Sequence, residues 1–246
     1  MKKKLAIFDF DSTIKKTTME GGGLVVLLPD QKLTQEMIQC KLNKDWDGLR
    51  ISIANELNSL NQVSKQDIIN ACAKEGQLIQ CIDKTIKFLA EDHDIVIISG
   101  ALDEFVKIFL DANGILEYVT DVLSTPATIT DEGKIVIKNY PENWIGPCPI
   151  TGRKLCKENV LKDYIYRKNN QYDEMVYVGD GSNDFCAAQT LGMKDIICPR
   201  QGYTLDKMLQ EEEEFISAHI TPWKDGLDLV EKLSLAKQQK KLLYIH

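Results

Sequence analysis

The stretch LAIFDFDSTI, residues 5–14, decides the fold of this chain. Five of its first six residues are apolar, which predicts a buried strand over residues 4–10. Asp9 and Asp11 stand at the end of that strand, and residues two apart in a strand share a face. Open parallel sheets bind ligands at the carboxyl ends of their strands, and two close carboxylates repel unless a cation or a proton lies between them. A cation site or a plain solvated strand end would each explain the pair.

Composition narrows the class of protein. The chain has 246 residues, enough for one large domain or a domain with an insert, and its 43% hydrophobic and 27% charged residues are typical of globular proteins. A net charge of −7 disfavours non-specific nucleic-acid binding. The longest apolar run, residues 24–29, is too short for a membrane span, and Asp9 and Asp11 interrupt any secretory signal. Seven cysteines without such a signal predict reduced thiols and a cytoplasmic location.

Alternating apolar strands and helices predict an α/β fold with a doubly wound parallel sheet. Further strands are predicted over residues 95–98, 118–124, 175–179 and 195–198, and helices over residues 104–114, 157–168, 184–193 and 223–239. Residues 127–138 alternate apolar and polar side chains around a Glu-Gly pair, which predicts a β-hairpin. Residues 15–84 carry polar helical patterns with few strand signals, so we expect a helical insert there.

A second acidic segment, VYVGDGSND at residues 176–184, repeats the pattern of an apolar strand that runs into acids, here Asp180 and Asp184. An EF-hand that began at Asp180 would need Gly at its sixth position and Glu at its twelfth, but Phe185 and Leu191 stand there. Oxygen ligands in a chain with three histidines suit a hard cation, Mg²⁺ above all. A plain Asp-Gly turn is the alternative.

Two further positions supply complementary chemistry. Ser99 ends the apolar segment IVIISG, and Gly100 gives close access to the backbone, so the hydroxyl and nearby N–H groups could hold an anion. An ordinary Ser-Gly turn would look the same. Lys157 begins a predicted helix. A single lysine is usually a surface residue, but the four carboxylates would otherwise leave the site strongly negative.

The order of these segments resembles the haloacid-dehalogenase-like hydrolases. The chain carries DFDST from Asp9, an apolar strand that ends in Ser99, Lys157 before a helix, and GDGSND from Gly179. Within that superfamily, RKLCKENVL, YVGDGSNDFC and CPRQGYTLDKML are most similar to the phosphoethanolamine/phosphocholine and pyridoxal phosphate phosphatase family. The resemblance therefore implies a phosphatase that acts on a small phosphorylated metabolite.

The resemblance also implies a domain organisation and a set of roles. Residues 1–14 and 85–246 would form a Rossmann-like core, and residues 15–84 a helical cap over the site. Asp9 would be the nucleophile and Asp11 the general acid and base. The substrate-binding residues that the resemblance implies are Ser99, Gly100, Lys157 and Glu20, and the Mg²⁺-site residues are Asp9, Asp11, Asp180 and Asp184.

The chain departs from the family in two respects, the residue at position 100 and the spacing between Cys148 and Cys156, which is wider than the family's. The family usually has an Asp directly after the motif-two Ser, where this chain has Gly100. Glu20 stands where the family usually carries a substrate-binding Asp, and a carboxylate there could pair with a cationic amine or simply be solvated. Arg200 and Tyr203 either line the site or have a structural role.

Several alternatives stay open. The segment SGA and the Glu20-Gly21 pair are also reminiscent of phosphoserine phosphatase. A non-catalytic phosphometabolite-binding regulatory protein could share the fold, although a degenerate member usually loses the nucleophile or the general acid, and both are present. Cys148 and Cys156 form no CxxC pair, which argues against zinc. No membrane or nucleic-acid partner is expected, and the oligomeric state is not predicted.

Overall fold

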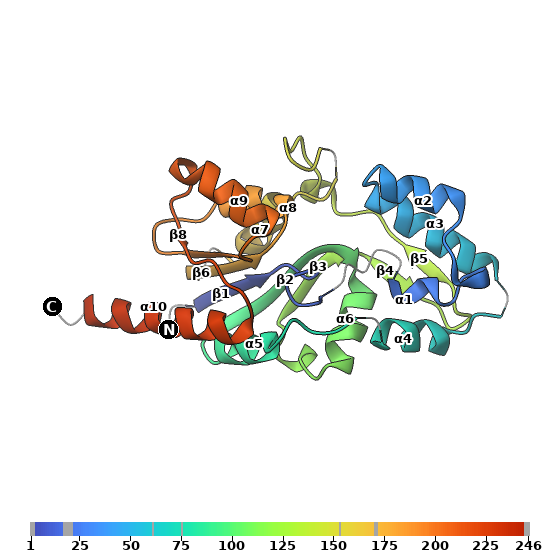
Figure 1. Cartoon of the computed structure of the whole chain (residues 1–246), viewed down its shortest axis with the longest axis horizontal. Coiled ribbons are helices and arrows are strands. Elements are labelled where there is room, and N and C mark those ends of the chain that lie inside the picture. Colours follow the sequence, from blue (N-terminus) through green and yellow to red (C-terminus); the bar gives the residue numbers. More distant parts are fainter. Residues whose placement is uncertain are drawn as a thin grey trace.

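The computed structural model describes residues 3–16, 22–60, 62–74, 76–152, 154–169 and 172–243, with side chains for all of these except 22 and 238–243. Its centre is a six-stranded sheet in which all neighbouring strands are parallel (Figure 1). In spatial order the strands are β3 (Asp121–Thr125), β2 (His93–Leu102), β1 (Lys3–Phe8), β6 (Tyr172–Gly179), β7 (Ile196–Pro199) and β8 (His219–Ile220). The predicted α/β fold with a doubly wound parallel sheet is confirmed.

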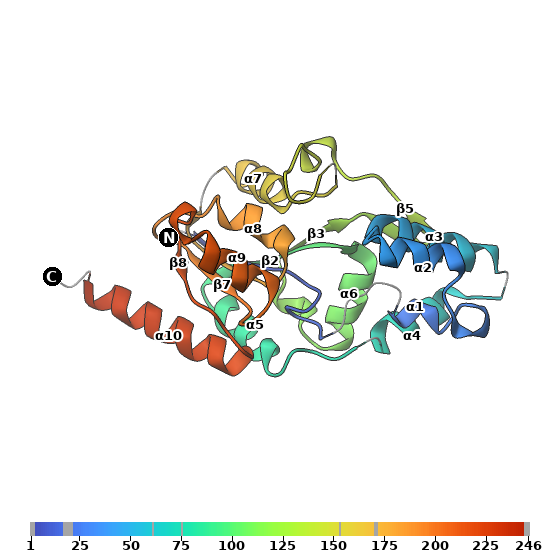
Figure 2. The same cartoon turned by 45° about the horizontal axis from the view of Figure 1, so that its top comes forward.

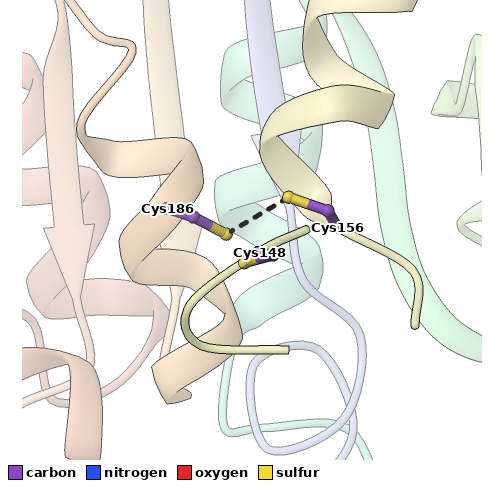
Figure 3. A group of neighbouring side chains, drawn as sticks. All are labelled: Cys148, Cys156 and Cys186. Carbon is purple, nitrogen blue, oxygen red and sulfur yellow. Dashed lines mark hydrogen bonds between the residues drawn. The ribbon is translucent and has the colours of Figure 1, made fainter. Parts of the chain in front are cut away.

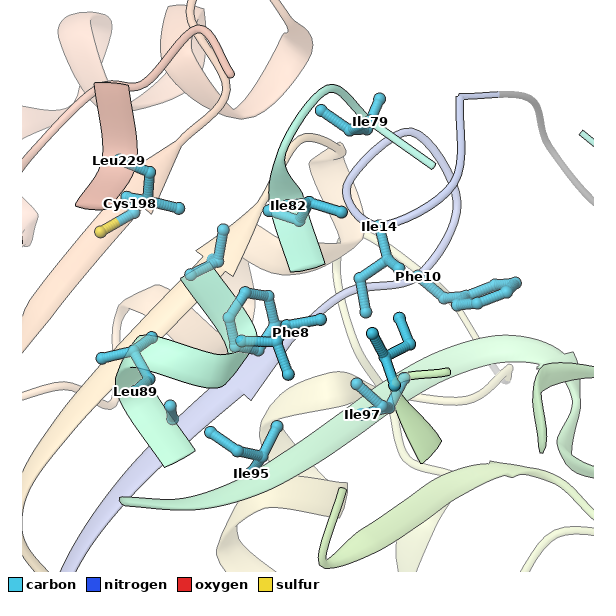
Figure 4. Packing of buried hydrophobic residues seen from close by; sticks show 14 of the residues in the cluster. Phe8, Phe10, Ile14, Ile79, Ile82, Leu89, Ile95, Ile97, Cys198 and Leu229 are labelled. Carbon is cyan, nitrogen blue, oxygen red and sulfur yellow. The ribbon is translucent and has the colours of Figure 1, made fainter. Parts of the chain in front are cut away.

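Helices cover both faces of this sheet. In β1, Ala6 and Phe8 belong to one hydrophobic cluster, and Leu5 and Ile7 belong to a second one on the opposite face. The helices on the first face are α5 (Ile82–Ala90), α6 (Asp103–Ala112) and α10 (Gly226–Leu243), and those on the second are α7 (Lys157–Arg167), α8 (Ser182–Ala188) and α9 (Thr204–Glu211). Figures 1 and 2 show these two layers, and Figure 4 shows the first cluster, where Phe8 packs among isoleucines and leucines.

A separate helical layer lies beyond one end of the sheet (Figure 1). Its elements are α1 (Gly22–Val25), η1 (Pro29–Gln31), α2 (Gln35–Leu42), α3 (Trp46–Ser59) and α4 (Lys65–Lys74). Their buried side chains join those of a hairpin, β4 (Ala127–Ile129) and β5 (Ile135–Ile137), and those of Leu102 and Phe105, in a third cluster. The predicted hairpin is therefore present, and it shares the hydrophobic core of the helical layer.

Asn58 of α3 ties the hairpin to that layer. Its side-chain Nδ2 donates to the Ile135 carbonyl at 2.8 Å, and its Oδ1 accepts from the Ile135 N–H at 2.7 Å. Lys134 Nζ also donates to the Asn58 carbonyl at 2.6 Å. The side-chain amide thus pairs with the free edge of β5 as a neighbouring strand would. The division of the chain into a core and a cap at residues 15 and 84 stays a prediction.

Some element boundaries differ from the sequence pattern. β1 ends at Phe8, shortly before the turn that begins at Phe10, and β2 continues past Ser99 to Leu102 with a register shift against β3. The pattern does not predict β8, which is a two-residue edge strand, or α9, whose end merges into an acidic run. The remaining short helices are η2 (Leu116–Tyr118), η3 (Glu142–Trp144) and η4 (Glu213–Phe215). Within the described part of the chain, no helix has the length and apolarity to cross a membrane.

Candidate active site

Asp9 and Asp180 follow two neighbouring strands of the sheet. Phe8 of β1 lies opposite Val178 of β6, and the Asp9 N–H donates to the Val178 carbonyl at 2.9 Å. The order of strands reverses beside β1, so this edge is the switch point at which open α/β sheets bind ligands. Carboxylate oxygens of Asp9, Asp180 and Asp184 lie within 4.8 Å of one another. The structure therefore brings together acids from two distant segments.

Lys157 is fully buried among these acids. It is the first residue of α7, and its Nζ lies 2.5 Å from Asp9 Oδ1 and 2.7 Å from Asp184 Oδ1. A buried ammonium needs such partners, because burial without them would cost several kcal/mol. Lys157 is thus a member of the site, and the surface position usual for a single lysine is excluded.

The segment GDGSND positions Asp184 through its own backbone. Asp184 Oδ2 accepts from the N–H groups of Asp180 at 3.1 Å and Gly181 at 2.9 Å, and its Oδ1 accepts from the Tyr177 hydroxyl at 2.7 Å. A Cβ placed on Gly179 would lie 2.6 Å from Asp184 Cγ. Only glycine therefore fits at position 179 while the carboxylate keeps this place. The arrangement fixes Asp184 as a rigid partner for Lys157.

Burial and mutual repulsion shift the pKa values of the carboxylates in this cluster. Burial raises the pKa of Asp9 to about 6, although the nearby Lys157 ammonium opposes the shift. Burial, together with the charges of Asp9 and Asp184, raises the pKa of Asp180 to about 9. Burial disfavours the charged form of Lys157, yet Asp184 and Asp9 more than offset this and raise its pKa above the ordinary value.

These residues fit a divalent cation. Three ionised carboxylates against one ammonium leave two negative charges, which Mg²⁺ would neutralise. All the side-chain donors are oxygens, the ligand type that Mg²⁺ prefers. The predicted Mg²⁺ site is therefore chemically consistent with the structure, with Asp9 and Asp180 as the side chains best placed to bind the ion.

Asp11 lies in a tight turn beside the same pocket. The N–H groups of Ile14 and Lys15 donate to the Phe10 carbonyl at 2.8 and 3.0 Å, which closes the turn. Ser12 has a φ of 58°, a left-handed conformation that costs roughly 1–2 kcal/mol for a residue with a side chain. Asp11 and Asp9 both line the pocket, although the strand ends at Phe8 and does not continue to Asp11.

The Arg200 side chain stabilises the turn that carries Asp11. Its guanidinium NH1 donates to the Ser12 carbonyl at 2.7 Å. The same group lies over the rings of Tyr203 and Trp223, 4.3 and 5.6 Å from their centroids. Of the two roles left open by the sequence, Arg200 therefore takes the structural one, because it holds the backbone that carries Asp11.

Ser99 and Gly100 also reach the pocket, from within β2 rather than from beyond its end. Ser99 is buried, and its Oγ accepts from the Ala101 N–H at 3.1 Å. The Gly100 carbonyl accepts from the Thr125 hydroxyl at 2.7 Å, which fixes the irregular part of the strand. Glu20, the remaining predicted substrate-binding residue, lies outside the described residues.

A pocket of about 510 Å³ joins these residues to the helical layer. Trp46, Asp47 and Arg50 from the start of α3 line it, together with Tyr140 and Lys154 from the segment before α7. Lys154 also bridges the two parts, because its Nζ lies 3.0 Å from Asp45 Oδ1.

The sequence pattern did not predict these residues, which form the roof of the pocket. They follow no strand end, and only the folded chain brings α3 over the sheet. The cluster of an aromatic, an acid and an arginine in the segment WDGLR was the single available signal.

Comparisons with known proteins identify the family of the chain. The family described as Putative Phosphatase matches residues 4–236. The chain is 28% identical over 240 residues to pyridoxal phosphate phosphatase PHOSPHO2 of Mus musculus, which covers 94% of this chain and 97% of that protein. It is 25% identical over 248 residues to the phosphoethanolamine/phosphocholine phosphatase of Gallus gallus, which covers 97% and 90%.

Solved structures share the fold. An apo phosphoserine phosphatase superposes with a TM-score of 0.58 at 16% identity and covers 94% of this chain and 98% of its own. A phospho-aspartyl intermediate analogue of phosphoserine phosphatase superposes with a TM-score of 0.56 at 20% identity and covers 96% and 99%. At these identities the similarity concerns the fold alone.

Proposed function

The chain belongs to the Putative Phosphatase family of haloacid-dehalogenase-like hydrolases, and from this premise we propose that it is a Mg²⁺-dependent phosphatase of small metabolites that forms an aspartyl-phosphate on Asp9. The observation that carries the proposal is the convergence of Asp9, Asp180 and the buried Lys157 at the switch point of the sheet. Phosphoryl transfer needs a positioned nucleophile and charge neutralisation, and this arrangement offers both.

In the proposed first step, an Asp9 carboxylate oxygen attacks phosphorus while the bond from phosphorus to the leaving oxygen breaks. Asp11 donates its proton to that oxygen. In the second step, Asp11 takes a proton from a water molecule, which attacks phosphorus and frees Asp9 and inorganic phosphate. Asp9 and Asp11 line one pocket, so Asp9 can attack phosphorus while Asp11 transfers protons to the leaving oxygen and from the water molecule.

The remaining residues would bind the phosphoryl group and the ion. Ser99 and the backbone at Gly100 would donate to phosphoryl oxygens, and Lys157 would add positive charge while it keeps Asp9 in place. Asp9, Asp180 and the Asp11 carbonyl would hold Mg²⁺, with Asp184 as an outer partner. When bound, Mg²⁺ supplies charge neutralisation for the transferring phosphoryl group.

The pocket supports a small substrate. Its volume of about 510 Å³ suits a single metabolite, and its roof combines Trp46 and Tyr140 with charged groups. Two relatives are named for pyridoxal phosphate and for phosphoethanolamine and phosphocholine. We therefore propose substrates of that type, in which a phosphate ester is joined to a ring or an amine.

A second candidate is phosphoserine, and one observation favours it. Asp47 and Arg50 form an ion pair in the pocket roof, and together they offer complementary charges to the amine and the carboxylate of an amino acid. Phosphoserine differs from phosphoethanolamine only by this carboxylate. Arg50→Ala should therefore weaken phosphoserine hydrolysis selectively if phosphoserine is the substrate, and should affect both compounds alike if it is not.

A substrate panel tests the proposal. Phosphate release from pyridoxal phosphate, phosphoethanolamine, phosphocholine and phosphoserine is measured with Mg²⁺ and after chelation. We expect Mg²⁺-dependent hydrolysis of at least one compound and a loss of about 10⁴-fold or more in Asp9→Asn. Asp131→Asn, whose side chain is 93% exposed, is the matched control and should keep full activity. Binding of these compounds without Mg²⁺-dependent turnover would overturn the proposal.

A further inference from the structure

Three cysteine side chains from separate segments meet in the interior beside the active site. Cys148 lies in the segment before α7, Cys156 immediately precedes α7, and Cys186 lies in α8. All three are buried, and their sulfur atoms lie within 4.8 Å of one another (Figure 3). The sequence did not indicate this cluster, because the third sulfur comes from a segment 30 residues beyond Cys156.

The sulfur spacing matches a metal site better than a disulfide. Tetrahedral thiolate ligands at 2.3 Å from Zn²⁺ would place their sulfur atoms about 3.8 Å apart. Cys156 Sγ and Cys186 Sγ are separated by 3.9 Å. None of the separations within the trio exceeds 4.8 Å, so a movement of Cys148 by about 1 Å would be enough to complete the third corner. A disulfide would pair two of the sulfurs at about 2.05 Å and leave the third alone.

The loop around Cys148 has the form of a ligand turn. The Cys148 N–H donates to the Gly152 carbonyl at 3.2 Å, and the Gly152 N–H donates to the Cys148 carbonyl at 2.8 Å. Gly152 has a φ of +65°, which lets the chain reverse tightly. The Thr151 N–H donates to Cys148 Sγ at 3.4 Å. An amide aimed at sulfur favours the thiolate, the form that binds metal.

We propose that Cys148, Cys156 and Cys186 form a Zn²⁺ site with three thiolate ligands and a fourth position for water. Zn²⁺ would replace the three thiol protons, which are released to solvent. Thiolate ligands select a soft or borderline ion such as Zn²⁺, whereas the carboxylates of the active site suit Mg²⁺. The proposal does not depend on the phosphatase function, because it rests on the thiol cluster alone.

The proposed zinc site would connect the two helices that carry Lys157 and Asp184. Cys156 directly precedes Lys157, and Cys186 follows Asp184 by two residues in the same helix. One ion would therefore tie α7 and α8 together behind the contact between Lys157 and Asp184, which spans 2.7 Å. Its expected role is structural, so metal content and stability are more direct readouts than activity.

Metal content tests the proposal. The full chain is purified under reducing conditions without chelator, incubated with Zn²⁺, freed of excess ion and analysed for zinc by mass spectrometry. We expect about one zinc per chain in the wild type, and far less in Cys156→Ser and Cys186→Ser. Cys40→Ser, at a half-buried cysteine outside the cluster, and Asp180→Asn should both retain zinc, which separates this site from the carboxylates.

Cobalt provides a second measurement on the unaltered protein. Co²⁺ bound to thiolates gives intense sulfur-to-metal absorption that carboxylate ligands do not give. We expect this absorption in the wild-type chain, its displacement by Zn²⁺, and a lower melting temperature after chelation at constant Mg²⁺. No thiolate absorption with Co²⁺, zinc retained by Cys186→Ser, or a disulfide between Cys156 and Cys186 in the freshly purified protein would each overturn the proposal.

Discussion

Lys157 shows how one buried side chain organises the site. Its ammonium contacts Asp9 at 2.5 Å and Asp184 at 2.7 Å with no exposure to solvent. Breaking a buried ion pair by removing one partner is strongly destabilising, because the remaining charges stay buried and unpaired. Lys157 therefore contributes to folding as well as to the proposed chemistry.

Lys157→Met should lower the free energy of unfolding by about 3–5 kcal/mol in the absence of Mg²⁺. Urea denaturation followed by circular dichroism measures this. Lys162→Met is the matched control in the same helix, because Lys162 pairs with Glu158 at an exposed site where such pairs contribute about 1 kcal/mol or less. Equal effects of the two substitutions would contradict the buried role of Lys157.

Protons and Mg²⁺ should compete for the carboxylates. The pKa of Asp180 is raised by burial to about 9 and that of Asp9 to about 6, so both hold protons below these values in the metal-free protein. Mg²⁺ needs the ionised forms, and its apparent affinity should therefore rise with pH between 6 and 9, by at most about tenfold per unit for each proton released.

The stability of the metal-free protein depends on pH in the opposite direction to its Mg²⁺ affinity. Because the folded pKa of Asp180 lies above its unfolded value, the metal-free fold binds more protons than the unfolded chain and loses stability as pH rises toward 9. Calorimetric Mg²⁺ titrations at pH 6, 7.5 and 9 measure the affinity. In Asp180→Asn, the rise of the affinity between pH 7.5 and pH 9 should be smaller. An affinity independent of pH would count against the assigned ligands.

At the scale of elements, the strand-to-helix junction after β6 is the most constrained. Gly179→Ala should displace the Asp184 carboxylate, because the new Cβ would lie 2.6 Å from Asp184 Cγ. We expect a loss of at least about 1–3 kcal/mol of stability, as for overpacked interiors, and a severe loss of phosphatase activity.

Gly192→Ala is the control for this substitution, since its Cβ would meet its nearest neighbour at an ordinary 3.7 Å. Thermal unfolding and phosphate release compare the two variants. Normal activity in Gly179→Ala would mean that Asp184 need not keep this position.

Elements with buried apolar runs could be predicted from the sequence, whereas elements without a clear period could not. Strands β1, β2 and β6 each contain an apolar run that leads into Asp9, Ser99 or Asp180, so both the sheet and the acids at its edge could be predicted. β8 has two residues and α9 ends in an acidic run, and neither gives a clear period. The hairpin was predictable, but its partner was not, because Asn58 and Ile135 are 77 residues apart and meet only through tertiary packing.

At the scale of the whole molecule, the pocket lies between the carboxyl edge of the sheet and the helical layer. The carboxyl edge of the sheet supplies Asp9 and Asp180, and the helical layer supplies Trp46 and Arg50. The first group lies at strand or helix ends, which sequence patterns mark. The second group lies on the face of a helix, where its side chains look like any amphipathic surface until the layer is placed. This division explains why the convergence of the acids could be predicted and the residues that would select the substrate could not.

The central claim is that this assembly makes Asp9 a nucleophile, and trapping the intermediate tests it most directly. The full chain is mixed with Mg²⁺ and its best substrate, quenched within one turnover, reduced with borohydride and analysed by peptide mass spectrometry. An aspartyl-phosphate is reduced to homoserine, so we predict homoserine at position 9 in the wild type and none in Asp11→Asn mixed without substrate. An unmodified Asp9 in a chain that is turning over, or the same modification at another acid, would contradict the account.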